Sequence, residues 1–257
     1  MNLNFINKLL PKYQLVKKIG FGGFSDIYLV KHKKNKYTLK IIYINKYKCL
    51  RIANNEVTIL KYLGDKQDFL PKLHKFIFDD NIFLILYHYI DGIDLFTVVN
   101  SFNFTESKWM EIFKKICYAL YYIHSHGIAH NDIKMENILL KDNSDIVVID
   151  FGLATTFDKE VEKHFNIEYS YNYGSGTILP PEREKDSNEN IDLRKSDVYN
   201  LGCLFYVCLY KQYPDLKKDV KYKNFYIDPI IRLSLNYNFN ERPTLEYIID
   251  YIKTYKS

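Results

Sequence analysis

Short runs of alternating apolar and polar residues fill the chain from Tyr13 to Tyr89 and predict β-strands. A glycine cluster separates the first two runs, and a lysine-rich turn separates the second from the third. The stretch Cys49–Leu63 differs, because its apolar residues recur at helical spacing and predict a short amphipathic helix. The strands are expected over residues 14–20, 26–30, 37–44, 73–78 and 82–89.

Beyond Asp91-Gly92 the periodicity becomes helical. The sequence T-E-S at 105–107 provides a helix start, and helices are expected over 109–124, 198–210 and 245–255. The fold class is therefore expected to be α+β and bilobal, with a β-rich N-lobe containing one main helix and a mostly α-helical C-lobe. We place the N-lobe at about 1–87, the hinge at about 88–92 and the C-lobe at about 93–257, with a ligand expected in the crevice between lobes.

Composition excludes several classes of protein. With 257 residues, 47% hydrophobic and 26% charged, the chain has enough apolar residues for a buried core and is neither disordered nor fibrous. The longest apolar run, Leu201–Tyr210, is half the length of a membrane span, and the first ten residues lack the apolar core of a signal peptide. The four cysteines show no disulfide spacing. A reduced, intracellular protein of the cytoplasm or nucleus is expected, with no membrane association.

The net charge of +5 is unevenly distributed. Residues 1–92 hold 16 Lys and Arg against 7 Asp and Glu, whereas residues 93–257 hold 20 against 24. The run K-H-K-K-N-K at 31–36 could indicate nucleic-acid binding, but its position between two predicted strands favours a solvated hairpin turn. No nucleic-acid partner is expected.

Two N-terminal features, a glycine-rich segment and a lysine with a candidate acidic partner, indicate phosphate binding only when they are taken together. The segment G-F-G-G-F-S-D-I-Y, Gly20–Tyr28, could let backbone N–H groups approach a polyphosphate, although a plain hairpin turn gives the same string. It is not a Walker loop, because Gly-Lys-Ser/Thr and a following helix are missing. Lys40 lies among apolar residues of the third strand, where a charge needs a partner. Glu56 on the predicted helix is the expected partner.

The most informative segments are I-A-H-N-D-I-K-M-E-N-I-L-L at 128–140 and V-V-I-D-F-G at 147–152. They place His130, Asp132, Lys134 and Asn137 on one loop and Asp150 after an apolar strand. Carboxylate and amide oxygens near a lysine suit a divalent cation and phosphate.

With these motifs in this order, the chain resembles a eukaryotic-type protein kinase catalytic domain of the serine/threonine family over residues 13–257. The resemblance extends to G-S-G-T-I-L-P-P-E at 174–182, S-D-V-Y-N-L-G at 196–202 and E-R-P-T at 241–244. It implies ATP and Mg²⁺ as cofactors and a Ser or Thr hydroxyl of a protein as acceptor. The enzyme is expected to be a monomer.

The resemblance also implies roles for individual residues. Asp132, Lys134 and Asn137 are the expected catalytic residues, and Asn137 and Asp150 the expected metal ligands. The expected nucleotide-binding residues are Ile19, Gly20, Phe21, Gly22, Gly23, Phe24, Ser25, Asp26, Ile27, Lys40, Glu56, Asp94, Leu139 and Asp150.

Further roles follow from the same resemblance. Tyr87 aligns with the gatekeeper at the rear of the nucleotide pocket, Asp197 is expected to support the catalytic loop, and Glu182 is expected to pair with Arg242. Lys134 and Ser175 match the serine/threonine pattern. Glu136 and Asp94 match positions at which some kinases receive substrate arginines, so a basic recognition sequence is a hypothesis.

Two departures from the family pattern have consequences. Asn131 replaces the arginine of H-R-D, which normally binds a phosphate on the activation segment. We therefore expect activity without phosphorylation at Thr155 or Thr156. Only 27 residues separate Pro214 from Arg242, so a substrate-docking helix is expected to be short or missing.

Two other functions are compatible with parts of the pattern. A pseudokinase scaffold that binds nucleotide would account for Asn131 and the short C-terminal region. Against it, all the residues that degenerate relatives usually lose are present: Lys40, Glu56, Asp132, Asn137 and Asp150. A small-molecule kinase would share the loop motifs but generally lacks the segments at 174–182 and 196–202.

Overall fold

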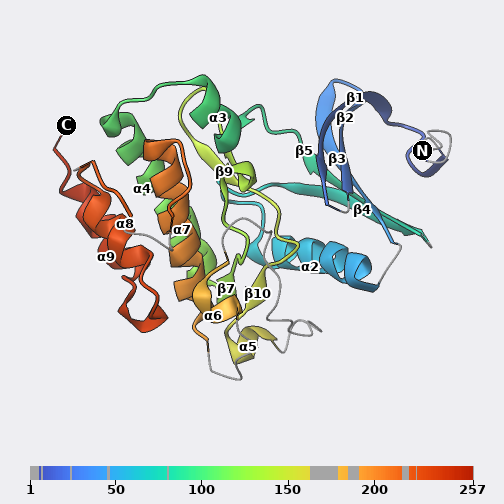
Figure 1. The fold of residues 1–257 in the computed structure, drawn as a ribbon. Coiled ribbons are helices and arrows are strands. Elements are labelled where there is room, and N and C mark those ends of the chain that lie inside the picture. The colour runs from blue at the N-terminus through green and yellow to red at the C-terminus, as the bar shows by residue number, and fades with distance from the viewer. Residues whose placement is uncertain are drawn as a thin grey trace. The chain divides into compact units, whose positions relative to one another are not determined.

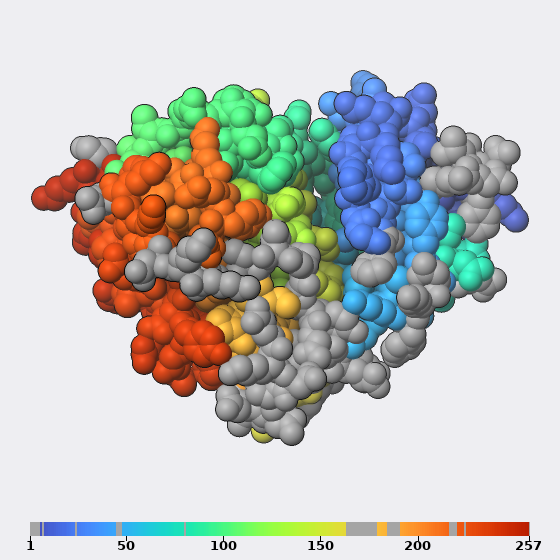
Figure 2. Space-filling model, in the orientation of Figure 1, coloured from blue at the N-terminus to red at the C-terminus, as the bar shows by residue number. Residues whose placement is uncertain are grey.

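The chain forms two compact units, Met1–Asp91 and Gly92–Ser257, which we call the N-lobe and the C-lobe (Figure 1). The computed structural model describes residues 6, 8–23, 25–44, 47–79, 81–162, 179–184, 191–215, 220–223 and 225–256. In the space-filling view of Figure 2, the N-lobe runs from blue to teal and the C-lobe from green to red. Strands dominate the first unit and helices the second, which confirms the predicted α+β class.

A five-stranded antiparallel sheet forms most of the N-lobe, with the strand order β1-β2-β3-β5-β4. Every predicted strand is present, and the ends differ by a few residues. The bounds are β1 Gln14–Gly22, β2 Ser25–His32, β3 Asn35–Tyr43, β4 Leu73–Asp79 and β5 Ile82–His88, with helix α2 at Tyr47–Leu63. The predicted helix thus begins two residues earlier than expected.

The lysine-rich run forms the predicted hairpin turn between β2 and β3. The two strands pair as far as His32 and Asn35, so Lys33 and Lys34 make the turn. Lys33 has a φ of 54°, the left-handed conformation found in two-residue hairpin turns. All the lysines of this run are exposed, as expected for a solvated turn.

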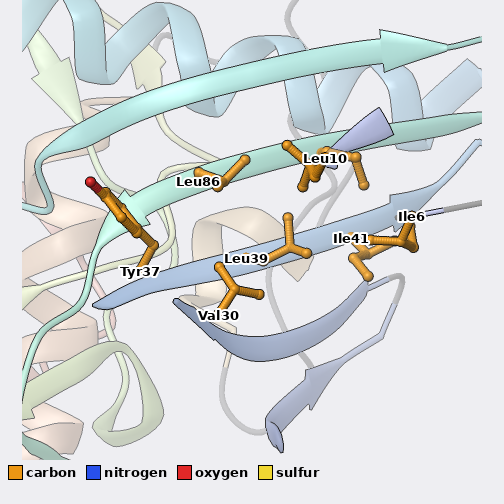
Figure 3. Packing of buried hydrophobic residues seen from close by; sticks show 8 residues of the cluster. Ile6, Leu10, Val30, Tyr37, Leu39, Ile41 and Leu86 are labelled. Carbon is orange, nitrogen blue, oxygen red and sulfur yellow. The ribbon is translucent and has the colours of Figure 1, made fainter. Parts of the chain in front are cut away.

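An apolar cluster covers one face of the sheet (Figure 3). Side chains alternate between the two faces of a strand, so Tyr37, Leu39 and Ile41 of β3 share one face, where they pack with Ile6 and Leu10 from the N-terminal segment. Val30, Leu84 and Leu86 complete the cluster. Lys40 therefore projects from the opposite face of β3, toward α2.

Two long helices, α4 Glu106–Ser125 and α7 Leu193–Tyr210, supply much of the buried core of the C-lobe. Thr105 begins α4, because its side-chain oxygen accepts a hydrogen bond from the Lys108 backbone N at 3.3 Å, which confirms the predicted start at T-E-S. α7 begins five residues before the predicted start at Val198. The other helices described are α3 Leu95–Ser101, α5 Lys159–Glu162, α6 Pro181–Glu184, α8 Asp228–Ser234 and α9 Leu245–Lys253.

Aromatic stacking and a close helix approach hold this core together. The rings of Phe113 on α4 and Phe205 on α7 stack with centroids 3.9 Å apart. α8 packs on α7 at Gly202, where an added Cβ would lie 2.7 Å from the Cβ of Ser234. The glycine of S-D-V-Y-N-L-G is therefore required for helix packing.

Two small sheets position the loops of the C-lobe. The strands β6 Ile93–Asp94, β8 Ile138–Leu140 and β9 Ile146–Val148 form one sheet in the order β6-β8-β9, and β7 Ile128–Ala129 pairs with β10 Thr155–Thr156. Gly92 allows the first sheet to close, because a Cβ there would lie 2.9 Å from the backbone oxygen of Leu140. The loop between β7 and β8 carries H-N-D, and the residues after β9 carry D-F-G.

The region between α7 and Arg242 is short. Its described residues contain α8, a helix of seven residues, and a 3₁₀ turn, η2, at Phe239–Glu241. Across the described part of the chain, no helix combines the length and apolar character needed to cross a membrane.

Candidate active site

A buried ion pair joins β3 to α2 in the N-lobe. Nζ of Lys40 donates to Oε2 of Glu56 at 2.7 Å, and the two residues are only 8% and 2% exposed. The hydroxyl of Tyr87 on β5 donates to the other carboxylate oxygen, Oε1, at 2.6 Å. Buried charges need such partners, and the predicted pairing of Lys40 with Glu56 is confirmed.

The glycine-rich segment forms the end of the β1–β2 hairpin. Gly23 lies in the turn, and Phe24 lies outside the described residues. The side chain of Phe21 is 83% exposed and Ile19 is 40% exposed, so apolar groups of this hairpin are available to a ligand. The register pairs Gly20 with Ile27, Phe21 with Asp26 and Gly22 with Ser25.

Asp26 has two partners within the N-lobe. Its carboxylate forms an ion pair with Lys18 of β1 at 2.5 Å and accepts a hydrogen bond from the Tyr43 hydroxyl of β3 at 3.0 Å. The bond from Lys18, helped by that from Tyr43, holds the pKa of Asp26 below its ordinary value. Burial and the bond to Asp26 raise the pKa of Tyr43 to about 12. Asp26 thus links three strands, and its nucleotide contact stays a prediction.

Asp132, Lys134 and Asn137 form a cluster in the loop between β7 and β8. Oδ2 of Asp132 accepts hydrogen bonds from Nζ of Lys134 at 2.9 Å and from Nδ2 of Asn137 at 2.8 Å. The same nitrogen of Asn137 donates to the backbone oxygen of Asp132 at 2.9 Å. The structure therefore brings together a carboxylate, an ammonium and an amide from the three residues predicted to be catalytic.

Asp197, in the second turn of α7, holds the start of this loop. Its Oδ1 accepts from the backbone N of Asn131 at 2.8 Å, and its Oδ2 accepts from the backbone N of His130 at 2.8 Å and from Nε2 of His124 at 2.9 Å. Burial raises the pKa of Asp197, but the hydrogen bonds and charge of His124 outweigh it and leave this pKa below its ordinary value. The predicted support of the catalytic loop by Asp197 is confirmed.

Both polar atoms of the Asn131 side chain have hydrogen-bond partners inside the C-lobe. Its Nδ2 donates to the backbone oxygen of Leu153 at 3.0 Å and to Oγ1 of Thr155 at 2.7 Å. Its Oδ1 accepts from Nη1 of Arg183 at 3.0 Å. The φ of 63° at Asn131 is left-handed, a conformation that asparagine tolerates better than most residues.

Arg183 brings a positive charge to the catalytic loop. It is 6% exposed and directly follows P-P-E, at the start of α6. Burial lowers the pKa of its guanidinium, whereas the negative charges of Asp197, Glu182 and Asp132 act in the opposite direction. An arginine charge is thus present near Asp132 even though the H-R-D arginine is replaced.

The two threonines named as phosphorylation positions lie in β10 and have internal partners. Thr156 is fully buried, and its hydroxyl donates to the backbone oxygen of Gly127 at 2.9 Å. Thr155 accepts the bond from Asn131. In this structure the Thr156 hydroxyl is not presented for modification, whereas Thr155 is partly exposed.

Asp150 lies two residues after the end of β9, and the residue before it is bonded to the loop that carries H-N-D. The backbone N of Ile149 donates to the backbone oxygen of Asn137 at 2.9 Å. Asp150 has a φ of 66°, a left-handed conformation that is strained for an aspartate and is typical of functional sites. Phe151 is buried, with its ring edge-on to the His130 ring at a centroid distance of 4.9 Å.

Asp94 and Leu139 are opposite each other on β6 and β8. Asp94 caps α3, because its two carboxylate oxygens accept from the backbone N of Thr97 at 2.8 Å and from the Thr97 hydroxyl at 3.0 Å. The pairing places two of the expected nucleotide-binding residues beside each other, and their contacts with a nucleotide stay predictions.

The oxygen donors of the C-lobe fit a hard divalent cation. Both hydrogen bonds of the Asn137 side chain named above are made by its nitrogen, which places the amide oxygen on the far side of the planar group from Asp132. Asp150 adds a carboxylate on the segment bonded to Asn137. Carboxylate and amide oxygens are the ligands that Mg²⁺ takes, so these two residues suit it.

A second buried ion pair connects Glu182 of α6 to Arg242, which directly follows η2. The guanidinium of Arg242 donates to both oxygens of Glu182 at 2.7 Å, and the Ser196 hydroxyl also donates to Glu182 at 2.7 Å. Burial raises the pKa of Glu182, but the bonds from Arg242 and Ser196 hold it below its ordinary value. The predicted pairing of Glu182 with Arg242 is confirmed.

Comparison with known proteins decides the family. The family model of the protein kinase domain matches residues 13–250. The chain belongs to the protein kinase domain family. It is similar to serine/threonine-protein kinase D of Synechocystis sp., with 28% identity over 80% of this chain and 42% of that protein.

Two further protein kinases show comparable similarity. Serine/threonine-protein kinase cds1 of Schizosaccharomyces pombe is 29% identical over 82% of this chain and 47% of that protein. CBL-interacting protein kinase 5 of Oryza sativa is 25% identical over 95% of this chain and 56% of that protein. This kinase domain therefore spans about half the length of the curated relatives it matches.

Two interactions of this kinase domain were missed from the sequence. The hydroxyl of Tyr87 bonds to Glu56, and Arg183 bonds to Asn131. The second could have been suspected, because an arginine is lost from H-R-D and another stands directly after P-P-E. By contrast, Ser175 and most of G-S-G-T-I-L-P-P-E lie outside the described residues, and their roles stay predictions.

Proposed function

We propose that the chain is an ATP-dependent protein serine/threonine kinase that transfers the γ-phosphate of ATP to a protein hydroxyl. The observation that carries this proposal is the Asp132–Lys134–Asn137 cluster. Phosphoryl transfer depends mainly on positioning and on neutralising charge, and this cluster supplies both. The family and the named serine/threonine kinases among its relatives support the proposal.

Asp132 and Lys134 act directly on the reacting groups in this proposal. The Asp132 carboxylate accepts or orients the proton of the attacking hydroxyl, and the Lys134 ammonium stabilises the negative charge of the γ-phosphate during transfer. Their 2.9 Å contact keeps both groups in one place. No covalent enzyme intermediate is required.

Nucleotide contacts are assigned to residues of each lobe separately. Lys40, oriented by Glu56, binds the α- and β-phosphates. Backbone N–H groups of the glycine-rich hairpin approach the phosphates. We assign nucleotide contacts to Ile19, Gly20, Phe21, Gly22, Gly23, Phe24, Ser25, Asp26 and Ile27 of the N-lobe and to Asp94 and Leu139 of the C-lobe.

Asn137 and Asp150 are the residues that would hold Mg²⁺. Mg²⁺ held there would neutralise part of the negative charge of the phosphates. The chain's own contribution is to fix the two oxygen donors through the Asn137–Asp132 bonds and the Ile149–Asn137 bond.

The expected substrate preference is for arginine or lysine upstream of the acceptor. Glu136 is exposed on the catalytic loop, and Asp94 lies partly exposed at the start of α3. In a Glu136→Gln variant the preference for peptides with an upstream arginine or lysine should fall by a few-fold, since an exposed ion pair contributes about 0–1 kcal/mol. A peptide library measures it, with Glu246→Gln on the exposed face of α9 as the charge-matched control. A wild-type enzyme without upstream preference would contradict the hypothesis.

Arg183 should matter for turnover although it is not predicted to touch ATP. Replacing it with methionine removes the charged donor of Asn131 Oδ1, a bond worth about 1.5–3 kcal/mol. We expect kcat to fall by about tenfold or more with little change in the KM for ATP, measured by steady-state phosphorylation. Arg194→Met is the control, because this arginine is exposed and pairs with Asp192 at the surface. Equal losses in both variants would contradict a role for Arg183 in the catalytic loop.

The proposed function is tested by incubating the purified protein with γ-labelled Mg·ATP and a mixture of basic and acidic protein substrates. Acid hydrolysis of the products should give labelled phosphoserine or phosphothreonine, and Lys40→Met should abolish the label. Label on tyrosine alone would contradict the serine/threonine assignment. If the protein substrates were replaced by small molecules and one of these became labelled, a small-molecule kinase would be favoured instead.

A further inference from the structure

The hydroxyl of Tyr87 makes a hydrogen bond that neither its alignment with the gatekeeper nor the proposed phosphoryl transfer explains. Tyr87 lies on β5, and its backbone pairs with Thr38 two residues before Lys40 on β3. Its hydroxyl donates to Oε1 of Glu56 at 2.6 Å, while Lys40 donates to Oε2 at 2.7 Å. Each oxygen of one buried carboxylate thus has a donor from a different strand of the sheet.

The charge and burial of this trio make the bond strong. Tyr87 is 7% exposed and Glu56 is 2% exposed, so little water is available to replace a lost donor. A hydrogen bond to an ionised acceptor is shorter and stronger than one between neutral groups, and the 2.6 Å distance agrees with this. Leaving a buried carboxylate oxygen without its donor is costly.

The bond also restricts how Glu56 can turn. With Lys40 alone, the carboxylate could rotate about its last bond and exchange one oxygen for the other. Donors on both oxygens, from β3 and from β5, fix the plane of the carboxylate and with it the position of the Lys40 ammonium. The constraint lies entirely within the N-lobe.

We propose that Tyr87 is a positioning residue that holds Glu56, and through it Lys40, in the orientation that binds the phosphates of ATP. This inference rests on the proposed function for its kinetic consequence, although its effect on nucleotide affinity is independent of turnover. The N-lobe would then keep its lysine–glutamate pair assembled by means of its own sheet.

Tyr87→Phe tests the proposal because it removes the hydroxyl and keeps the ring. We expect kcat/KM for Mg·ATP to fall by about tenfold or more, the loss expected when a hydrogen bond to a charged group is removed. The KM for the protein substrate should stay unchanged, because Tyr87 acts only on the nucleotide side.

Tyr210→Phe is the matched control. Tyr210 is also 7% exposed, and its hydroxyl donates to the buried carboxylate of Asp228 at 2.8 Å within the C-lobe. Both variants lose a buried tyrosine–carboxylate bond and should lose thermal stability. Only Tyr87→Phe should lose kcat/KM for ATP, and equal kinetic losses would overturn the proposal.

A double-mutant cycle on Mg·ATP affinity, measured by calorimetry, separates this inference from the proposed function. In the wild-type background Tyr87→Phe should weaken Mg·ATP binding, and in a Glu56→Ala background it should have almost no further effect. Equal effects in both backgrounds, or no effect in the wild type, would overturn the role of Tyr87. A wild-type protein that binds Mg·ATP without transferring phosphate would refute the proposed function, and the cycle would still decide the role of Tyr87.

Discussion

Replacing Asp132 with asparagine should lower the rate of phosphoryl transfer by about 10²- to 10⁴-fold, the usual contribution of a positioned general base. Asparagine has nearly the same size, so the buried loop keeps its shape. It cannot accept the proton of the attacking hydroxyl, and it weakens the contact with Lys134. The KM for ATP should stay close to that of the wild type, because Asp132 acts on the acceptor hydroxyl.

The measurement is steady-state phosphorylation of one protein substrate over a range of ATP concentrations. Asp142→Asn is the control, because Asp142 is exposed in the turn between β8 and β9 and is expected to leave kcat unchanged. A melting curve confirms that each variant is folded. If Asp132→Asn kept more than about a tenth of the wild-type kcat, the assigned role of Asp132 would be wrong.

Replacing Arg242 with methionine should lower the free energy of unfolding by about 3–5 kcal/mol, because it leaves a buried carboxylate without its partner. Arg242 is 2% exposed and donates to both oxygens of Glu182, and its guanidinium lies 4.7 Å from the Tyr199 ring centroid. A loss of this size is a large share of the stability of a typical domain. Urea unfolding at pH 7 measures it.

Two further variants show whether the ion pair causes the effect. Arg232 is exposed and lies 4.6 Å from the Tyr222 ring centroid, so Arg232→Met loses a similar aromatic contact and should cost about 1 kcal/mol or less. Adding Glu182→Gln to Arg242→Met removes the unpaired charge and should restore part of the stability. A loss below about 1 kcal/mol in Arg242→Met would contradict this account.

The Glu182–Arg242 pair should also make the free energy of unfolding fall at acid pH. Arg242 and Ser196 hold the pKa of Glu182 below its ordinary value against the effect of burial. The stabilisation is therefore complete above the unfolded pKa of about 4.3 and is lost as the pH falls through the lower folded pKa. This part of the acid sensitivity should be absent from Glu182→Gln.

Local patterns in the sequence predicted the elements well where the periodicity was regular. Alternating residues located every strand of the N-lobe sheet, because one face packs on an apolar cluster and the pattern repeats every two residues. The helix α3 was missed, because it has seven residues and its signal is the Asp94 cap. The start of α7 was placed too late, because the polar residues R-K-S-D in its first turns interrupt the apolar periodicity. The actual start is marked by Asp192, whose side chain caps the helix.

The motifs predicted the main site residues, but they could not show contacts between distant positions. The pair Lys40–Glu56 was expected because a lysine among apolar residues needs a partner, and the pair Glu182–Arg242 was expected from the family resemblance. The structure contains both. Tyr87 and Arg183 were different, because their partners lie 31 and 52 residues away and no motif joins them. Such contacts depend on which strands and loops the fold brings together.

The most direct test of the central proposal measures binding and turnover of Mg·ATP on the same phosphatase-treated preparation. The proposed kinase should bind Mg·ATP and transfer phosphate to serine or threonine without prior phosphorylation of Thr155 or Thr156. In Asp150→Asn, turnover should fall by at least about a hundredfold, as expected when a residue assigned to the metal is lost. Wild-type protein that binds Mg·ATP but transfers no phosphate would contradict the account and would favour a nucleotide-binding scaffold.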